Sequence, residues 1–408
     1  MSDIGFLEKF DLPDPVCRLK TAWSTVNLWT GTTSSCHRVE SDLIPDNYDE
    51  FHNTSSKIED RKNMLSGIWP DNACYYCKKI EDAGGTSDRL FANSWEEEEF
   101  NPPELYKDNK SVVLTPKFLE VYFNNVCNLS CIYCSASHSS IWETEDKLNA
   151  PIVEFGDQAN TQINKQLYLR RVEQHWKWLE KNVKNLSHYN ILGGEPFFQP
   201  EFEKNVDFFM DNPNEHLHFA IYSNLKVNPL KMRNILNKIN LCIEKKAIKS
   251  FRIYCSLDCW GPEQEYTRTG LNLKNWEENF NIILHEYPKI RLQIHSTIIS
   301  MGLKTLPDLC KKITEWSEVR EIKHSLSLAD GIESMHPGIW PNSLFESDWN
   351  SAIDNTGSLI TKNKISSLKK MCENQKENTK LQNDLKSILS QLDIRRNTDY
   401  TKIFNWLN

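Results

Sequence analysis

Beyond residue 115, short apolar segments alternate with longer segments that have helical hydrophobic spacing. The apolar segments are rich in β-branched and aromatic residues, which predicts strands. The first helical segment places Leu167, Val172, Trp176, Leu179 and Val183 on one face. Because strands alternate with helices, we expect a parallel sheet that binds ligands at the carboxyl ends of its strands. The strands are expected at 117–123, 188–192, 217–223, 251–258, 291–299 and 321–328, and the helices near 167–183, 200–210, 229–246, 273–286 and 305–316.

Six strands are too few for a full eightfold barrel, so the expected α/β fold is a partial (βα)6 TIM-like barrel. Alternation along two of the strands separates an apolar face from a polar face. A parallel sheet that is buried on both faces is normally apolar throughout, so the polar face predicts a cavity for a polar ligand. The polar residues are Tyr254, Ser256 and Asp258 on one strand and Gln293, His295 and Thr297 on the next, and they oppose Ile253, Cys255, Leu257, Leu292, Ile294, Ser296 and Ile298.

The stretch 92–111 divides the chain, because it combines an acidic run, a proline pair and polar residues in the manner of a linker. Its acidic run, Glu96 to Glu99, is interpreted as a solvated stretch without a role of its own. We therefore expect a small Cys-rich α+β module over 1–91 and the partial barrel over 112–342. The remainder, 343–408, has a helical pattern, clearest over 380–393.

Composition restricts the classes of partner. The chain has 408 residues, with 48 Lys and Arg against 56 Asp and Glu, for a formal net charge of -8. No overall basic field is available to hold nucleic acid, and no apolar run reaches the roughly 18 residues of a membrane span. The N-terminus also lacks the basic and apolar regions of a secretory signal. These features predict a cytoplasmic protein that binds neither membrane nor, as its main partner, nucleic acid.

Twelve cysteines stand out in such a chain, where they are expected to be reduced and available for metal or catalysis. Cys127, Cys131 and Cys134 form a CxxxCxxC directly after the first barrel strand. Three thiolates can hold three irons of a [4Fe-4S] cluster and leave the fourth iron without a protein ligand. A closed zinc site or structural cluster would need four ligands.

With these residues the sequence resembles the radical S-adenosylmethionine (SAM) superfamily over about residues 115 to 335. The CxxxCxxC with Tyr133 before its last cysteine is similar to the family's cluster loop. The resemblance implies that SAM binds the open iron and is cleaved to a 5'-deoxyadenosyl radical, which takes hydrogen from a substrate in the barrel. Further residues similar to SAM-binding positions are Gly193, Gly194, Glu195, Pro196, Asn224, Ser256, Asp258, Arg268 and Thr297, although the Asn usual just after Thr297 is absent.

Elementary chemistry suits several of these positions. Gly193 and Gly194 let backbone carbonyls approach an ammonium group, and the Glu195 carboxylate can accept from the same group. An ionised Asp258 can accept from both hydroxyls of a ribose. The resemblance also implies a low-potential electron donor of flavodoxin or ferredoxin type. The substrate expected is a peptide or protein; alternatives are a nucleotide, RNA or small metabolite, or a non-catalytic iron-sulfur or zinc scaffold.

Four further cysteines, Cys17, Cys36, Cys74 and Cys77, lie in the N-terminal module. Their pattern, with Gly31 in the turn of an expected hairpin, resembles the twitch or SPASM auxiliary-cluster modules of phage-type radical SAM proteins, which would place the enzyme in a host cytoplasm. Those modules usually follow the barrel, whereas this one precedes it. A second [4Fe-4S] cluster, a zinc site and unrelated thiols all remain open.

The other five cysteines are expected in the core, as small buried apolar residues. They are Cys242, Cys255, Cys259, Cys310 and Cys372, of which Cys259 is also a candidate for the site because it follows Asp258. His295 and His324 lie on expected strands and are weaker candidates for substrate contact. The segment 81–89 is expected to be structural and to pack the module against the barrel.

Overall fold

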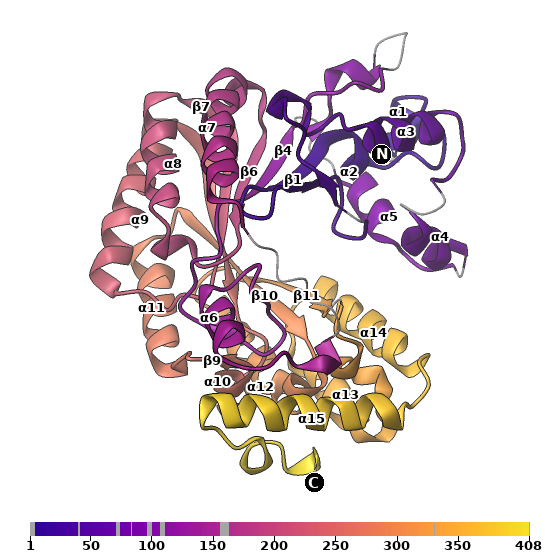
Figure 1. Ribbon diagram of the computed structural model, residues 1–408, viewed down its shortest axis with the longest axis vertical. Coiled ribbons are helices and arrows are strands. Elements are labelled where there is room, and N and C mark those ends of the chain that lie inside the picture. Colours follow the sequence, from indigo (N-terminus) through magenta and orange to yellow (C-terminus); the bar gives the residue numbers. More distant parts are fainter. Residues whose placement is uncertain are drawn as a thin grey trace.

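The computed structural model describes residues 5–39, 41–70, 74–82, 84–95, 100–106, 111–155, 163–329 and 331–407. The protein is a mixed α/β structure built on a large, mostly parallel sheet (Figure 1). All six strands expected from the sequence form, and they lie parallel and in chain order within this sheet. They are β4 (Phe118–Tyr122), β6 (His188–Leu192), β7 (Asn214–Ser223), β8 (Ile248–Ser256), β10 (Ile290–Ile298) and β11 (Lys323–Leu328).

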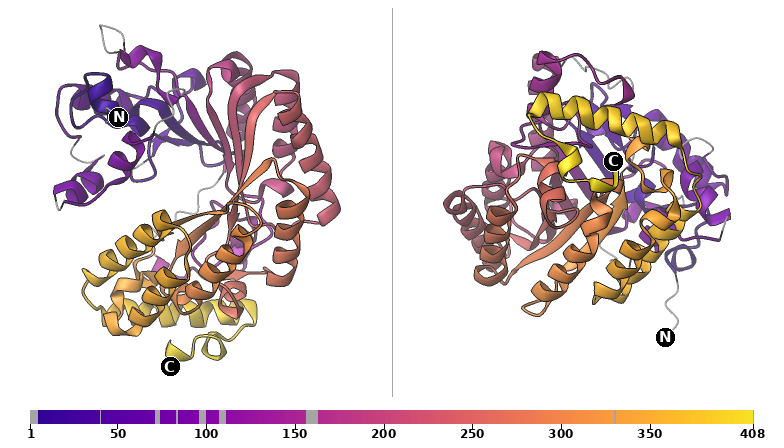
Figure 2. Two further views of the ribbon diagram at one scale, coloured as in Figure 1. Left: turned by 180° about the vertical axis from the view of Figure 1, so that it is seen from behind. Right: turned by 90° about the horizontal axis from the view of Figure 1, so that it is seen from below.

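Helices pack against one face of the sheet and bury its apolar side chains (Figures 1 and 2). Ile253, Cys255 and Ile294 on that face are fully buried, whereas Tyr254, Ser256 and His295 on the other face are partly exposed. The alternation expected from the sequence is therefore confirmed on β8 and β10. The covering helices are α7 (Lys165–Asn182), α8 (Pro200–Asp211), α9 (Pro229–Glu244), α11 (Leu273–Glu286) and α12 (Leu306–Ser317).

The N-terminal region joins this sheet directly. Strand β1 (Trp23–Asn27) pairs in parallel with β4, so the order across the described sheet is β11-β10-β8-β7-β6-β4-β1-β2-β3. β1 and β2 (Thr32–Ser34) form the expected hairpin with Gly31 in its turn, and β3 (Asp42–Leu43) is the edge strand. The accompanying helices are α1 (Phe6–Lys9), α2 (Arg18–Ala22), α3 (Ser55–Leu65), α4 (Tyr75–Asp82) and α5 (Asp88–Asn93).

The stretch 92–111 contributes side chains to the core, whereas its composition predicts a connector that does not pack. Phe100 is fully buried, and its ring lies 5.7 Å from that of Phe118 on β4. Leu105 is also fully buried. The acidic run 96–99 and residues 107–110 lie outside the described residues. The apolar side chains of this stretch thus tie the N-terminal region to β4.

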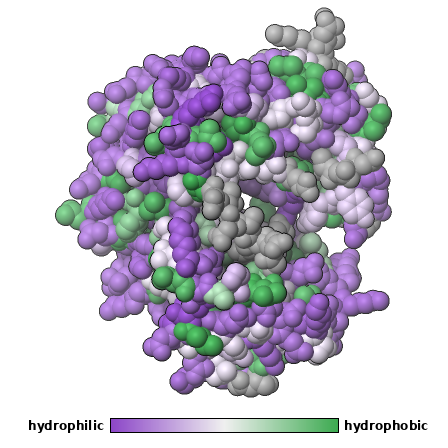
Figure 3. Space-filling model, viewed as in Figure 1, coloured by the Kyte–Doolittle hydropathy of each residue, from purple (hydrophilic) through white to green (hydrophobic). Residues whose placement is uncertain are grey.

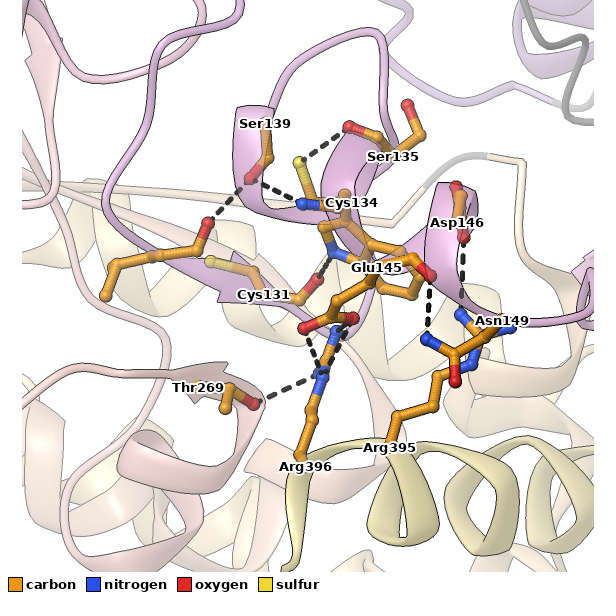
Figure 4. Close-up of polar contacts among 12 residues, drawn as sticks. Cys131, Cys134, Ser135, Ser139, Glu145, Asp146, Asn149, Thr269, Arg395 and Arg396 are labelled. Atoms are coloured by element: carbon orange, nitrogen blue, oxygen red, sulfur yellow. Dashed lines mark hydrogen bonds and ion pairs between the residues drawn. The ribbon is translucent and has the colours of Figure 1, made fainter.

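The C-terminal region is helical, as its pattern predicts. It contains α13 (Glu346–Asn355), α14 (Leu359–Glu373) and α15 (Thr379–Arg396). Leu385, Ile388, Leu389 and Leu392 anchor α15 in the core. Its last turn lies against α6 (Ser140–Leu148), the helix that follows the CxxxCxxC loop (Figures 1 and 4).

The face of the molecule shown in Figure 3 is mostly hydrophilic, with apolar residues in small separate groups. No helix among the described residues combines the length and the hydropathy of a bilayer span.

Candidate functional site

The CxxxCxxC loop lies between β4 and α6, and its backbone is fixed at both ends. Ser130 and Cys131 form the short strand β5, which pairs antiparallel with β9 (Arg268–Thr269). Ser139 caps α6 by accepting from the Trp142 amide and donates to the Leu129 carbonyl at 2.7 Å (Figure 4). These hydrogen bonds define the course of the loop.

The three cysteines of the loop lie near one another in a partly buried environment. Burial, followed by the neighbouring Cys131, raises the pKa of the Cys127 thiol to about 12. Burial also raises the pKa of Cys134, and both other cysteines add to this effect. Bringing three thiolates together therefore requires a bound cation that displaces their protons, as soft metal centres do.

The donor set of this loop fits a three-cysteine iron-sulfur cluster. Cys127, Cys131 and Cys134 are the sulfur ligands that such clusters use, and a tetrahedral zinc site would need a fourth. Within the part of the chain that is described, no three His, Cys, Asp or Glu side chains are already arranged as a metal site. The fit is thus one of ligand type and loop placement, and small side-chain rotations would have to complete it.

A buried charge pair lies next to the loop. The Arg268 guanidinium donates through Nε and Nη2 to the two oxygens of Asp258, each at 2.9 Å. The Tyr133 hydroxyl donates to Asp258 Oδ2 at 2.5 Å, and the Thr297 amide donates to Oδ1 at 2.8 Å. Arg268 Nη1 lies 3.9 Å from the sulfur of Cys131. The predicted residues of the cysteine loop, of the chain just after β8, of β9 and of β10 are therefore brought together in one network.

Asp258 is fully engaged by this network. Its carboxylate accepts four hydrogen bonds from the protein, and its side chain is 1% exposed. A ribose could reach it only by exchanging with one of these donors. Asp258 thus holds Tyr133, which belongs to the cysteine loop, and Arg268, which adjoins it.

The turn at Gly193 and Gly194 packs directly on the same loop. Gly194 has a φ of +57°, and a Cβ there would lie 2.3 Å from the Val126 carbonyl oxygen. Gly193 has a φ of +77°, and a Cβ there would lie 2.3 Å from the Tyr122 ring. Only glycine fits both the backbone conformation and the space at these positions. The turn therefore supports the chain just before Cys127.

Glu195 is buried and bonded to the end of β7. Its carboxylate accepts from the Ser223 hydroxyl at 2.8 Å, the Asn224 amide at 2.7 Å and the Phe197 amide at 3.2 Å. Burial raises the pKa of Glu195 to about 7, in spite of these hydrogen bonds. The carboxylate thus serves here to join the glycine turn to β7, and Pro196 begins the buried turn that follows.

Asn224 lies beside the first cysteine. Its side-chain nitrogen donates to Asn128 Oδ1 at 2.9 Å and lies 3.9 Å from the sulfur of Cys127. Ser256 lies on β8, two residues before Asp258, with a partly exposed side chain on the polar face. Of the two, Asn224 has its side-chain amide beside the loop.

The polar face also contains Glu120 and Tyr222, which sequence reasoning missed. Glu120 of β4 is 1% exposed and accepts from Thr25, Asn190 and His37, the last at 3.0 Å. The rings of Tyr222 and Tyr254 stack at 4.3 Å on the neighbouring strands. Glu120 lies in the strand sequence FLEVY, which is otherwise apolar. This sequence does not show that the Glu120 side chain is on the polar face of the sheet.

The two histidines that were weaker candidates lie on β10 and β11, with partly exposed side chains. Burial lowers the pKa of His295 to about 4 and that of His324 to about 3, so both imidazoles are neutral. They hydrogen-bond to Ser325 and Ser296 on adjacent strands. Cys259 is fully buried behind the strand end, and the four other cysteines predicted for the core, Cys242, Cys255, Cys310 and Cys372, are buried as well.

The four N-terminal cysteines converge on one pocket. Cys17, Cys36, Cys74 and Cys77 all line it, together with the basic side chains of Lys20, Arg38 and Arg89. Burial raises the pKa of all four thiols, to about 12 for Cys74. Asp88 lines the pocket as well, and the three cations are paired with Asp60, Asp88 and Glu81. Four thiols around one pocket fit a closed four-cysteine centre.

The segment 81–89 is structural, as expected, but its contacts lie within the N-terminal region. Arg89 is 2% exposed and donates through Nε to Glu81 at 2.9 Å. It also donates to the carbonyl oxygens of Asp14 and Val16, and its guanidinium lies 4.8 Å from the Trp69 ring centre. These contacts hold α4, α5 and the chain around Cys17 together.

No protein-family model matches the sequence, and no curated protein matches it. Among solved structures, Streptococcus suis SuiB bound to precursor peptide SuiA aligns over 82% of this chain and 68% of its own, at 14% identity and TM-score 0.39. SuiB bound to S-adenosylmethionine aligns over 80% and 65%, at 14% identity and TM-score 0.38. TYW1 with a lysine-pyruvate adduct aligns over 57% and 70%, at 16% identity and TM-score 0.31. These identities and TM-scores are too low to assign a family or a function.

Proposed function

We propose that the protein is a radical SAM enzyme whose partial barrel is formed by β4 to β11. The observation that carries the proposal is the meeting of four segments at the carboxyl ends of neighbouring parallel strands. The CxxxCxxC loop is contacted by the Gly193–Gly194 turn, by Asn224 after β7 and by Arg268, itself bound to Asp258 after β8. Ligands of parallel α/β sheets bind at this edge.

Cys127, Cys131 and Cys134 would hold a [4Fe-4S] cluster through their thiolates. When bound, such a cluster supplies one electron to SAM, which is cleaved to methionine and a 5'-deoxyadenosyl radical. The chain's own contribution is to bind and orient the cofactors and to keep water away. Arg268, 3.9 Å from the Cys131 sulfur, places a positive charge next to the ligand set.

The polar groups around the loop would orient SAM. Asn224 and Ser256 offer an amide and a hydroxyl, and the Gly193–Gly194 turn brings backbone close to the loop. Thr297 is partly exposed at the end of β10. Asp258 and Glu195 would act indirectly, by holding the residues that surround the site, because their carboxylates already accept hydrogen bonds from those residues.

The substrate would enter the polar face of the sheet, where Tyr222, Tyr254 and Glu120 lie. We propose a peptide or protein substrate, since the N-terminal cysteines resemble the auxiliary modules of peptide-modifying family members. A nucleotide, RNA or small metabolite is the second candidate, and the polar face itself is compatible with it. A low-potential flavodoxin- or ferredoxin-like protein would supply the electron.

Cys17, Cys36, Cys74 and Cys77 would hold an auxiliary [4Fe-4S] cluster, with zinc as the alternative. Their convergence on one pocket supports a shared metal centre. It does not distinguish between the two, because both take four thiolates. A four-ligand centre would be closed and would serve electron transfer or structure.

SAM cleavage tests the proposed function. The anaerobically reconstituted chain, given SAM and a strong reductant, is expected to form 5'-deoxyadenosine. Cys131→Ala should abolish the product, whereas Cys242→Ala, which removes a buried core thiol away from the site, should retain it. Product formation by Cys131→Ala at the rate of the parent chain would overturn the proposal.

A further inference from the structure

The last residue of α15 reaches the helix that follows the cysteine loop. Arg396 donates through Nη2 to Glu145 of α6 at 2.9 Å and through Nε to both Glu145 oxygens at 3.2 Å. Its Nη1 donates to Thr269 Oγ1 of β9 at 3.1 Å. The Arg396 side chain is 5% exposed, so the guanidinium is held in one place by these partners (Figure 4).

The partners of Arg396 hold the backbone on both sides of Cys131. The guanidinium lies 4.7 Å from the centre of the Trp142 ring, and Trp142 Nε1 donates to the Cys131 carbonyl at 2.7 Å. Thr269, the other partner, pairs with Ser130 across β5 and β9. Arg396 therefore contacts both Trp142, the donor to the Cys131 carbonyl, and Thr269, the strand partner of Ser130.

The neighbouring Arg395 makes a similar link that does not reach the cysteine. It donates through Nη1 to Asp146 at 3.2 Å and through Nη2 to the Ala150 carbonyl, at the far end of α6. Its side chain is also 5% exposed. Arg395 thus offers a matched control for a guanidinium that joins α15 to α6.

Helix α15 does not depend on either arginine for its position. Asp393 accepts from the Tyr266 hydroxyl at 2.9 Å, and Gln391 donates to Glu154 at 3.0 Å. Four apolar side chains of the helix are buried as well. Replacing one arginine should therefore alter the cysteine loop without releasing the helix.

We propose that Arg396 is a positioning residue for Cys131, which makes the C-terminal helix part of the cluster-binding site. The proposal rests on the proposed function, since Cys131 must be a cluster ligand for the positioning to matter. The Arg396 guanidinium fixes Trp142 and Thr269, and these two residues fix the Cys131 backbone. Loosening them would let the loop open and release iron.

The first test uses the full-length chain without iron. Arg396→Gln is expected to raise amide hydrogen exchange over 130–134 by roughly tenfold, while Arg395→Gln changes it less than about twofold. Arg396→Lys keeps the charge but loses the forked geometry of the guanidinium. Its hydrogen exchange over 130–134 should therefore lie between those of Arg396→Gln and Arg395→Gln. Equal exchange in Arg396→Gln and Arg395→Gln would overturn the proposal, because the effect would then belong to the helix contact in general.

The second test uses the reconstituted chain. With a ferrous chelator in excess, Arg396→Gln should lose the iron of the CxxxCxxC loop roughly tenfold faster than Arg395→Gln, and the electron paramagnetic resonance spectrum of its reduced cluster should change. Unchanged release and an unchanged spectrum would contradict the positioning role. Failure of the parent chain to bind iron at this loop would instead refute the proposed function and leave the exchange result standing.

Discussion

Arg268 and Cys131 face each other in the two-residue pairing of β5 with β9, and the Arg268 guanidinium lies 3.9 Å from the cysteine sulfur. The same guanidinium is bound to both oxygens of Asp258. Two segments that are 137 residues apart in the chain thus meet at the predicted ligand set. This contact links the cysteine motif to the residues after β8 in one site.

The Asp258–Arg268 pair should be required for both stability and SAM binding. Asp258→Asn would leave a buried guanidinium without its counter-ion, which costs about 3 to 5 kcal/mol in comparable pairs. We expect a lower free energy of unfolding in the iron-free chain and weaker SAM binding in the reconstituted one. Asp348→Asn, which breaks the less buried pair with Lys304, is the control and should leave SAM affinity unchanged. Unaltered SAM affinity in Asp258→Asn would remove this residue from the site.

Gly194→Ala should disrupt the support of the cysteine loop. The new Cβ would lie 2.3 Å from the Val126 carbonyl, in addition to the strain of a positive φ. Gly67→Ala is the matched control, because Gly67 has a φ of +77° with no atom within 4 Å of the added Cβ. We expect Gly67→Ala to lower the free energy of unfolding, measured by thermal unfolding, by about 1 kcal/mol. Gly194→Ala should lower it by at least twice as much and should also lower the iron content of the reconstituted chain. Equal costs would mean that the turn does not press on the loop.

Glu195 should make the stability of the iron-free chain depend on pH. Its pKa is about 7 in the folded chain against 4.5 as the ordinary value, so between these values the folded state holds a proton that the unfolded state has lost. Stability should therefore fall as pH rises from about 4.5 to 7, by up to roughly 3 kcal/mol. In Glu195→Gln this fall should be smaller, so urea unfolding of both chains across the range is the measurement. Parallel pH profiles would show that Glu195 titrates normally.

Metal content separates the two cysteine sets. If both hold [4Fe-4S] clusters, anaerobic reconstitution should give about eight iron and eight sulfide per chain, and the Cys74→Ala, Cys77→Ala double variant should give about four of each. The triple alanine variant of Cys127, Cys131 and Cys134 is the counterpart and should retain the other four. About four of each in the parent chain, with one zinc, would exclude the auxiliary iron-sulfur cluster.

Much of the fold could be predicted because periodicity reports burial directly. All six strands form where apolar segments predict them, and polar residues such as Ser256 and Thr297 lie on the partly exposed face. The packing of the acidic and proline-rich stretch 92–111 could not be predicted, because it depends on two isolated apolar residues, Phe100 and Leu105. Composition averages over a segment and cannot show which single side chain finds a partner.

The site was predictable in its residues but not in their partners. The cysteine spacing and the Gly-Gly turn identify the loop and its support, yet nothing in the sequence shows that Asp258 and Glu195 are occupied by donors of the chain itself. Arg396 lies in a polar, surface-like helical pattern about 260 residues beyond the loop, so its contact with Glu145 and Trp142 is a property of the tertiary structure alone.

The central claim is that Cys127, Cys131 and Cys134 hold a cluster with one iron open to SAM. Mössbauer spectroscopy of the ⁵⁷Fe-reconstituted chain tests it most directly, with the Cys74→Ala, Cys77→Ala variant used to remove any signal from the second set. Addition of SAM is expected to change the isomer shift of one iron in four and leave the other three unchanged. Four equivalent irons with and without SAM would contradict the claim.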